Sequence, residues 1–428
     1  MNEPGPLVVF ANFLSDLAVD LDQGQVLAQW AEQAPRKAWL LRPGDVLVTP
    51  VPLSGEFLRY VGDLTGVPGE QLTVVEVPPA GPVPLAEAVR RAGLVERVRD
   101  LVAGPGTAAL LPTALDASAI AFARDLGLTV HPYPTIDGAA GALRTTMLLN
   151  TKAGFRDAAE QVGMRLPTGR VCRRPAVEGA VRELLQRYER VVVKPDRSAG
   201  GHGLRFLARG DLDGGAALEL DAVGGSQGTW VVEECVDVAE SVSIQMENSA
   251  SGTHALFSGA MRTVGGSFTG YTCPLPPSCA HVAGELEEWG RRLGRRLSGQ
   301  GYLGPFGVDA LVGTDGVAYA SESNVRRTAT TTPHAMITRL TAASAVPHPA
   351  WSVAKGRARR PFGFEEALRR LRGHDLAFDP GRGEGVVLYA DAPPDGRTWR
   401  YAVVAADAGA VREREGLVAE ALELECGA

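Results

Sequence analysis

The sequence is poor in the features that mark several classes of protein. Its 428 residues include 5 cysteines, with no C-x-x-C pair and no histidine spaced to complete a zinc site, so neither a disulfide framework nor structural zinc is predicted. No apolar run is long enough to span a membrane. The run from Leu7 to Leu14 has no basic segment before it and predicts a strand rather than a signal peptide. A net charge of −7 disfavours a broad nucleic-acid surface. We therefore expect a cytoplasmic protein with reduced thiols and neither nucleic-acid nor membrane partners.

Residues 1–142 alternate between strand and helix patterns. This alternation predicts an α/β domain with a small parallel sheet, and no G-x-G-x-x-G sequence marks a dinucleotide site in it. The expected strands are Leu7–Phe10, Val46–Val48, Leu72–Val77 and Ala108–Leu111, with helices at Leu85–Val102 and Ala117–Leu126.

The rest of the chain divides into three further units, predicted at residues 143–236, 237–348 and 349–428. A helix is expected over Leu143–Val162, and Gly265–Tyr271 is expected to be a flexible polar crossing. Paired strands are expected at Phe306–Val312 and Val317–Glu322, around the turn Gly313–Gly316. The last unit predicts a small α+β extension, with a hairpin and a closing helix.

One stretch, Val191 to Gly203, combines a β-branched strand with a lysine and a glycine-rich loop. Lys194 ends the strand, and the loop after it contains Gly200, Gly201 and Gly203. Such a loop lets backbone N–H groups approach an anion, while the lysine supplies a positive charge, so the stretch suits phosphate. A β-hairpin with a glycine-rich turn explains the same pattern equally well.

A second group of residues suits a magnesium ion. Asp309 and Glu322 lie on the two strands that we expect to pair, and Asn324 follows Glu322 on the same face of an extended segment. Two carboxylates and an amide oxygen are hard oxygen ligands of the kind that hold Mg²⁺ beside phosphates. Taken one at a time, the acids fit ordinary strand ends better than a metal site, but the set together with Arg326 favours the metal.

Several cations accompany this group. Lys152 and Lys194 come from different segments and are suited to converge on one phosphate. Arg326 is a planar donor for a phosphate or a developing oxyanion. Arg327 beside it is not separable from Arg326 by sequence alone, and Arg262 is a weaker candidate for the same role.

The order of these residues resembles the ATP-grasp superfamily, whose members join a carboxylate to an amine through an acyl phosphate. The resemblance covers roughly residues 145–345, and its most specific part is the sequence Glu322-x-Asn324-x-Arg326. It implies an ATP-grasp fold, two α+β subdomains that clamp ATP, with a pre-ATP-grasp α/β domain before it. The implied ATP ligands are the side chains of Lys152 and Lys194 at the phosphates, a loop of Ser198, Gly200, Gly201 and Gly203 over them, Glu233 at the adenine amino group, backbone groups of Glu234 and Val236 at the adenine edge, and Glu240 at the ribose. Asp309, Glu322 and Asn324 are the implied Mg²⁺ ligands.

One departure from the family pattern concerns the catalytic arginine. Many dipeptide-forming members carry an arginine two residues before the metal aspartate, where this chain has Gly307. The role therefore falls to Arg326, Arg327 or Arg262.

The overall layout resembles the pheganomycin-type peptide ligases. That resemblance implies a ligase that joins an amino-acid carboxylate to the N-terminal amine of a peptide, in natural-product biosynthesis, and leaves a homodimer open. A ligase of two free amino acids or another small carboxylate, and a nucleotide-binding regulator without turnover, are the alternatives.

Overall fold

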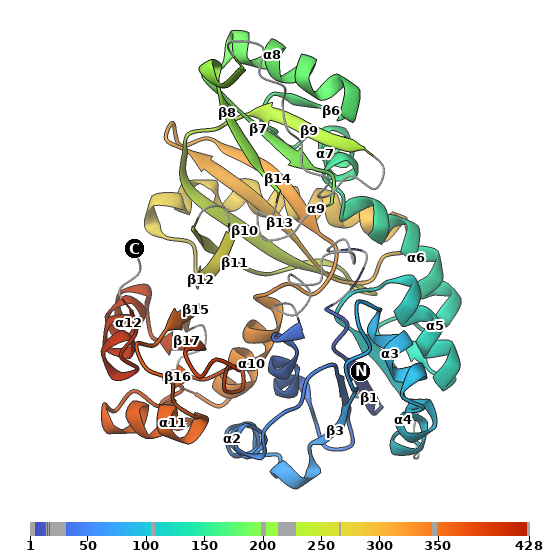
Figure 1. Ribbon diagram of the computed structural model, residues 1–428, viewed down its shortest axis with the longest axis vertical. Helices are drawn as coiled ribbons and strands as arrows, with labels where there is room; N and C mark the ends of the chain where they lie inside the picture. Colours follow the sequence, from blue (N-terminus) through green and yellow to red (C-terminus); the bar gives the residue numbers. More distant parts are fainter. Residues whose placement is uncertain are drawn as a thin grey trace.

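Three β-sheets and the helices that cover them make up the computed structural model of the protein (Figure 1). The structure describes residues 5–13, 15, 17, 31–103, 108–197, 203–212, 228–264, 267–344 and 349–425. In Figure 1 a small sheet lies at the top, the N-terminal unit at the lower right and the C-terminal unit at the lower left, with the largest sheet joining them.

The N-terminal unit is a five-stranded sheet of order β3-β2-β1-β4-β5, and every neighbouring pair in it is parallel. The predicted parallel α/β unit is therefore confirmed. Its strands are buried because helices and the neighbouring units cover the sheet. The elements are β1 Leu7–Phe10, the 3₁₀ helix η1 Ala34–Leu40, β2 Val46–Thr49, α2 Gly55–Thr65, η2 Gly69–Gln71, β3 Thr73–Glu76, α3 Leu85–Arg91, α4 Val95–Leu101, β4 Ala109–Pro112, α5 Ala117–Leu126, β5 Thr129–Val130 and α6 Ile136–Leu149.

The small sheet has four antiparallel strands in the order β6-β9-β7-β8, with α8 packed against it. Its separate core joins the apolar face of α8 to inward residues such as Val191, Val193 and Trp230. The elements are α7 Lys152–Gln161, β6 Gly169–Arg173, η3 Arg174–Ala176, α8 Val177–Arg187, β7 Arg190–Pro195, β8 Arg205–Ala208, η4 Arg209–Leu212 and β9 Thr229–Glu234.

The largest sheet has eight strands in the order β14-β13-β10-β11-β12-β15-β17-β16. The last three of these strands belong to the C-terminal extension, and they continue the sheet because β15 pairs antiparallel with β12. The elements are β10 Val238–Ser249, β11 Gly252–Val264, β12 Ser267–Cys273, η5 Pro277–Val282, α9 Ala283–Gly299, β13 Gly304–Gly313, β14 Ala318–Asn324, α10 Thr331–Thr341, β15 Ala350–Arg357, α11 Phe364–Gly373, β16 Gly385–Val387, β17 Thr398–Ala405 and α12 Ala408–Ala421.

Three expectations about single elements were wrong. The helix expected over Leu143–Val162 is two helices, because the Thr151 side chain accepts from Gly154 N and caps a new helix. The helix expected over Leu85–Val102 is also divided, at Gly93 with φ +68°. The polar crossing expected at Gly265–Tyr271 is instead largely strand β12, which pairs with β11 and β15 and so is half of a hairpin.

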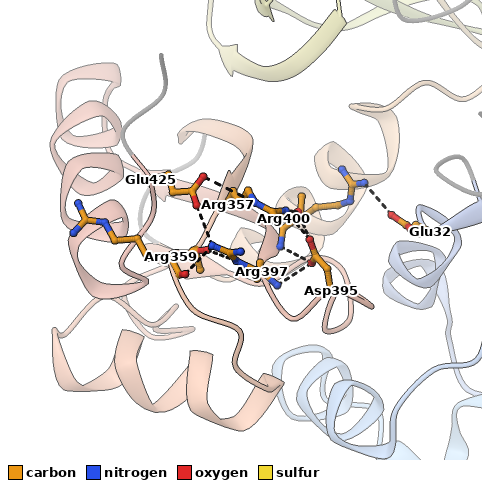
Figure 2. Close-up of polar contacts among 9 residues, drawn as sticks. Glu32, Arg357, Arg359, Asp395, Arg397, Arg400 and Glu425 are labelled. Carbon is orange, nitrogen blue, oxygen red and sulfur yellow. Dashed lines mark hydrogen bonds and ion pairs between the residues drawn. The ribbon is translucent and has the colours of Figure 1, made fainter.

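The C-terminal unit is tied together by arginine–carboxylate pairs along β15 and β17 (Figure 2). Arg357 lies 2.9 Å from Asp395 and Arg397 lies 3.1 Å from Glu425. In Figure 2 Arg400 points away from this group, toward Glu32 just before η1, at 3.9 Å. The last unit is thus in polar contact with the N-terminal unit.

Two expected absences concern cysteine and the membrane. In the described part of the chain the cysteines are free thiols: Cys172, Cys235, Cys273 and Cys279. Over the same residues no helix has the length and apolar character needed to cross a bilayer.

Candidate functional site

The two acids of the predicted metal group lie opposite each other on neighbouring strands. Asp309 of β13 is in register with Glu322 of β14, and the Asn324 side chain donates to Asp309 Oδ2 at 2.8 Å. A β-bulge follows Asp309, and bulges re-aim the side chains beside them. The expected pairing of the two strands is confirmed.

The surroundings of this pair favour a bound cation. Burial, and then the Glu322 carboxylate, raise the pKa of Asp309 well above its ordinary value. Two carboxylates held this close repel each other, and a cation bound between them would offset that repulsion. The described residues contain no cluster of three or more His, Cys, Asp or Glu side chains, so the protein would supply two carboxylates and the Asn324 amide. The donor set fits Mg²⁺.

Basic side chains approach the acids from one side. Lys152 is the first residue of α7, and its Nζ lies 3.5 Å from Glu322 Oε2. Arg326 follows β14. Burial lowers its pKa, and the negative charges of Glu322 and Asp309 offset this lowering only in part. Lys152, Glu322, Asn324 and Arg326 line a small, mainly polar hollow. Negative and positive groups thus face one space of the kind that a metal–phosphate pair would fill.

Asn150 fixes the position of Arg326, a role that the sequence did not reveal. It lies between α6 and α7, and its Oδ1 accepts from Arg326 and from Val325 N at 3.1 Å. Its Nδ2 donates to Thr146 O at 2.7 Å. The residue therefore couples the α6–α7 junction to the end of β14.

Lys194, the centre of the glycine-loop prediction, lies on β7 within an ion-pair group. Its Nζ lies 2.5 Å from Glu233 Oε2, which is a close ion pair. Glu233 Oε1 accepts from Arg156 of α7 at 2.9 Å. Sequence reasoning missed Arg156, since 77 residues separate it from Glu233. In this structure Glu233, predicted to meet adenine, is held between two cations.

The two predicted phosphate lysines come from neighbouring backbone segments. Lys152 N donates to Asp196 O at 2.9 Å, and Ala153 N donates to the Asp196 side chain at 2.9 Å. The start of α7 is thereby held against the end of β7. The two ammonium groups nevertheless contact different acids, Glu322 and Glu233.

Of the remaining predicted nucleotide residues, Glu234 lies at the end of β9, Val236 between β9 and β10, and Glu240 on β10. The N–H of Glu234 donates to Thr168 O at 2.8 Å, and its side chain accepts from Thr168 N at 2.6 Å. Burial raises the pKa of Glu240. Gly203 has φ +76°, a conformation that glycine adopts without strain. Ser198, Gly200 and Gly201 lie outside the described residues, so their predicted role stays untested.

Two of the three arginine candidates, Arg326 and Arg327, line one hollow, and the third, Arg262, lies apart from them. Arg326 lies beside the acids, as described above. Arg327 donates its N–H to Thr113 O at 3.0 Å and lines a larger hollow with Glu247 and His131, between the N-terminal sheet and β13. Arg262 instead pairs with Glu415 of α12 at 2.6 Å and donates to Thr272. Arg262 is therefore not gathered with the acids.

The departure from the family pattern at Gly307 has a structural reason. A Cβ on Gly307 would lie 2.5 Å from Gln245 Nε2, so the Gln245 side chain of β10 fills the space above this glycine. Gln245 Oε1 in turn accepts from Thr328 at 3.1 Å. The neutral side chains of Gln245 and Thr328 thus occupy the space beside Gly307.

Comparisons with known proteins agree with this architecture. Residues 34–128 match the family model described as the pre ATP-grasp domain, and residues 366–418 match the PGM1 C-terminal domain. A search of curated proteins gave no match.

Solved structures match over nearly the whole chain. N5-carboxyaminoimidazole ribonucleotide synthetase from Thermus thermophilus is 12% identical with a TM-score of 0.58, and the match covers 99% of each chain. Biotin carboxylase from Campylobacter jejuni is 12% identical with a TM-score of 0.59, over 98% of this chain and 92% of that one. The biotin carboxylase domain of the Hydrogenobacter thermophilus 2-oxoglutarate carboxylase is 14% identical with a TM-score of 0.57, over 99% and 91%. At these identities the likeness establishes the fold: the chain is a mixed α/β protein with an ATP-grasp fold and a pre-ATP-grasp domain on its N-terminal side.

Proposed function

We propose that this protein is an ATP- and Mg²⁺-dependent ligase that joins a carboxylate to an amine. The observation that carries the proposal is the gathering of Glu322 and Asn324 with Lys152 and Arg326 around one polar hollow, with Asp309 in register with Glu322 and bonded to Asn324. Solved structures of the same fold were determined with ADP, β-γ-ATP or MgADP, which supports a nucleotide in this position.

The chain's own residues would divide the work as follows. Asp309, Glu322 and Asn324 would hold Mg²⁺, which, when bound, neutralises charge on the transferred phosphate. Lys152 and Lys194 would bind the phosphates, and the loop at Ser198–Gly203 would cover them and exclude water. Glu233, Glu234, Val236 and Glu240 would form the adenosine side of the site.

The proposed reaction proceeds in two steps. A carboxylate oxygen of the acid attacks the γ-phosphorus of ATP, the bond to the β–γ bridging oxygen breaks, and ADP leaves with an acyl phosphate formed. The amine nitrogen then attacks the acyl carbon, loses a proton and expels phosphate. Asn150 positions Arg326 to stabilise the oxyanion that forms after the amine attacks and before phosphate leaves.

For the substrates, we propose an amino-acid carboxylate and the N-terminal amine of a peptide, as the resemblance to pheganomycin-type peptide ligases implies. Two hollows support a site for more than one substrate, because the one lined by Arg327 and Glu247 adjoins the one lined by Arg326. Two free amino acids, or another small carboxylate, are the alternative.

The test is a screen for ADP release that crosses candidate acids with amino acids and short peptides, followed by product mass. We expect ADP and phosphate only when an acid and an amine are both present. Release of AMP and pyrophosphate would rule out the acyl phosphate route. Binding of ATP without any ADP release across the panel would instead favour the nucleotide-binding regulator.

Two variants examine the assigned residues. Glu322→Gln should lower Mg²⁺-dependent turnover by about two orders of magnitude or more with the fold intact, since a metal ligand is lost. Glu287→Gln, on the exposed face of α9, is the matched control. Lys194→Ala should weaken ATP affinity in titration calorimetry, with Lys355→Ala as control. Equal ATP affinity in the two lysine variants would mean that Lys194 and the loop after β7 form a hairpin with no role in binding ATP.

A further inference from the structure

Two buried cations of the N-terminal unit point at the start of α10. Arg36 and Lys37 of η1 have exposures of 4% and 1%, and both lie over the Phe13 ring, at 4.9 and 5.2 Å from its centre. Lys37 Nζ donates to Thr332 Oγ1 at 2.9 Å, and Arg36 donates to Ala329 O at 3.3 Å. Both side chains therefore end beside the segment that connects Arg327 to α10.

Arg36 and Lys37 lack a carboxylate partner in the described part of the protein, whereas Glu247 lines one hollow with Arg327 and Glu32 lies 3.9 Å from Arg400. Burial, and then the charges of Arg36 and Arg327, lower the pKa of Lys37 well below its ordinary value. No carboxylate among the described residues forms an ion pair with Arg36 or Lys37, and Arg36 Nε is buried without a partner. Burial lowers the pKa of Arg36 to about 10, and the positive charge of Arg400 contributes to this lowering. Buried, unpaired cations cost several kcal/mol, so the arrangement favours a bound anion.

The neutral groups around the cations are also hydrogen-bond donors. α10 begins at Thr331, and the N–H groups of Thr331 and Thr332 have no acceptor within the helix, whereas Pro333 has no N–H and His334 N donates to Thr330 O at 2.9 Å. The hydroxyl groups of Thr330, Thr331 and Thr332 lie on buried residues at the same place. A helix N-terminus of this kind attracts negative charge, here together with buried basic side chains from a second unit.

We propose that Arg36, Lys37 and Arg327, with the first turn of α10, bind the carboxylate of a substrate. This inference rests on the proposed ligase function and deepens it. The segment from Glu322 to α10 is continuous, so the carboxylate site adjoins the metal–phosphate site through Arg326 and Arg327. The carboxylate belongs either to the acid that is activated or to the terminal carboxylate of the amine substrate.

The first test uses acetate as the probe and acetamide, its neutral isostere, as the control. At constant ionic strength, acetate in place of chloride should raise the melting temperature of the full-length protein by roughly 1–3 °C, and acetamide should not. Lys37→Met should abolish the rise and should not lower the melting temperature in chloride, because it removes an unpaired buried charge. Lys355→Met, at an exposed lysine, should retain the rise.

Two results would overturn the proposal: equal effects of acetate and acetamide on the wild type, or a Lys37→Met protein that keeps the acetate response. Should Lys37→Met fail to fold, Arg327→Met provides the same comparison from the opposite side of the cluster. Neither measurement involves ATP, so failure of the proposed function would appear separately, as loss of ATP binding or ADP release in the wild type.

The second test identifies the source of the carboxylate. In the ADP-release assay, the amine substrate is offered with a free carboxylate and as its amide. A KM that rises at least tenfold for the amide in the wild type, and no longer differs in Lys37→Met, assigns the cluster to the amine substrate. An unchanged KM for the amide, with a raised KM for the acid in Lys37→Met, assigns it to the acid. If Lys37→Met changes neither KM, the cluster is not a substrate site.

Discussion

The buried group of Arg156, Glu233 and Lys194 offers a sharp test of how the nucleotide side of the site is held. The side chains of these residues have exposures of 9%, 4% and 9%, so water screens their charges little. We consider Glu233→Gln, which keeps the shape of the side chain and removes its charge. In the variant, Arg156 and Lys194 stay buried but lose the carboxylate with which both form ion pairs.

The two cations lose unequal amounts in this variant. Arg156 keeps the carboxylate of Glu160 at 3.3 Å and the carbonyl of Pro167 at 3.1 Å. Lys194 has no second acid among the ion pairs of the described residues. Removing one partner of a buried ion pair typically costs about 3–5 kcal/mol, and because only Lys194 is stranded we expect the lower end, about 3 kcal/mol. The double variant Glu233→Gln/Lys194→Met removes the stranded charge and should recover at least about half of that loss.

The measurement has to be local, because a chain with three sheets is not expected to unfold in one step. Hydrogen exchange followed by mass spectrometry on peptides of β7 and β9 reports the free energy of opening of the small sheet. Glu178→Gln is the control, since the pair of Glu178 with Arg182 on α8 is exposed and worth roughly 0.5 kcal/mol or less. A change below about 1 kcal/mol for Glu233→Gln, or a double variant no more stable than the single one, would refute the reasoning.

Three further predictions concern the α6–α7 junction and the core beside α10. Gly154→Ala should destabilise the protein by about 1–3 kcal/mol in thermal unfolding, because its Cβ would lie 2.2 Å from Leu148 O, whereas Gly141→Ala, with open space around it, should stabilise α6 by up to about 1 kcal/mol; equal effects would contradict the steric argument. Asn150→Ala should lower kcat about 10–100-fold with little change in the KM for ATP, since it frees Arg326 without touching the lysines; an unchanged kcat would remove Asn150 from the site. Burial lowers the pKa of His334 to about 4, so between pH 6.5 and 4 the unfolded chain binds the extra proton and stability falls as the pH drops; His334→Phe should flatten this dependence in melting curves, and an unchanged slope would place it elsewhere.

The pairing of Asp309 with Glu322 was predictable from the sequence because its geometry is local. Gly313–Gly316 closes a tight turn with Gly316 at φ +80°, and that turn sets β13 against β14. Once the register is set, Asp309 and Glu322 must face each other. The parallel N-terminal sheet was predictable for a similar reason, since short buried strands alternate there with helices of ordinary length.

The side chains that hold the site in place were not predictable, because their contacts span long stretches of sequence. The separation is 77 residues for Arg156 and Glu233 and 295 for Lys37 and Thr332. No spacing rule connects such positions. The α6–α7 break is a different case: Thr151 followed by Gly154 is a local capping signal, and the strong helical pattern on both sides concealed it.

The pairing of β12 with β15 has a consequence for how the chain can be divided. A protein that ended near residue 348 would leave β12 as an edge strand, with unpaired backbone groups and an uncovered Tyr271 that now packs against Trp351. Long open edges of this kind recruit strands from other molecules. In the whole chain the same side of the sheet ends instead in β16, which is three residues long and offers little for another strand to join. The C-terminal extension thus acts as an end piece that keeps the central sheet from growing between molecules.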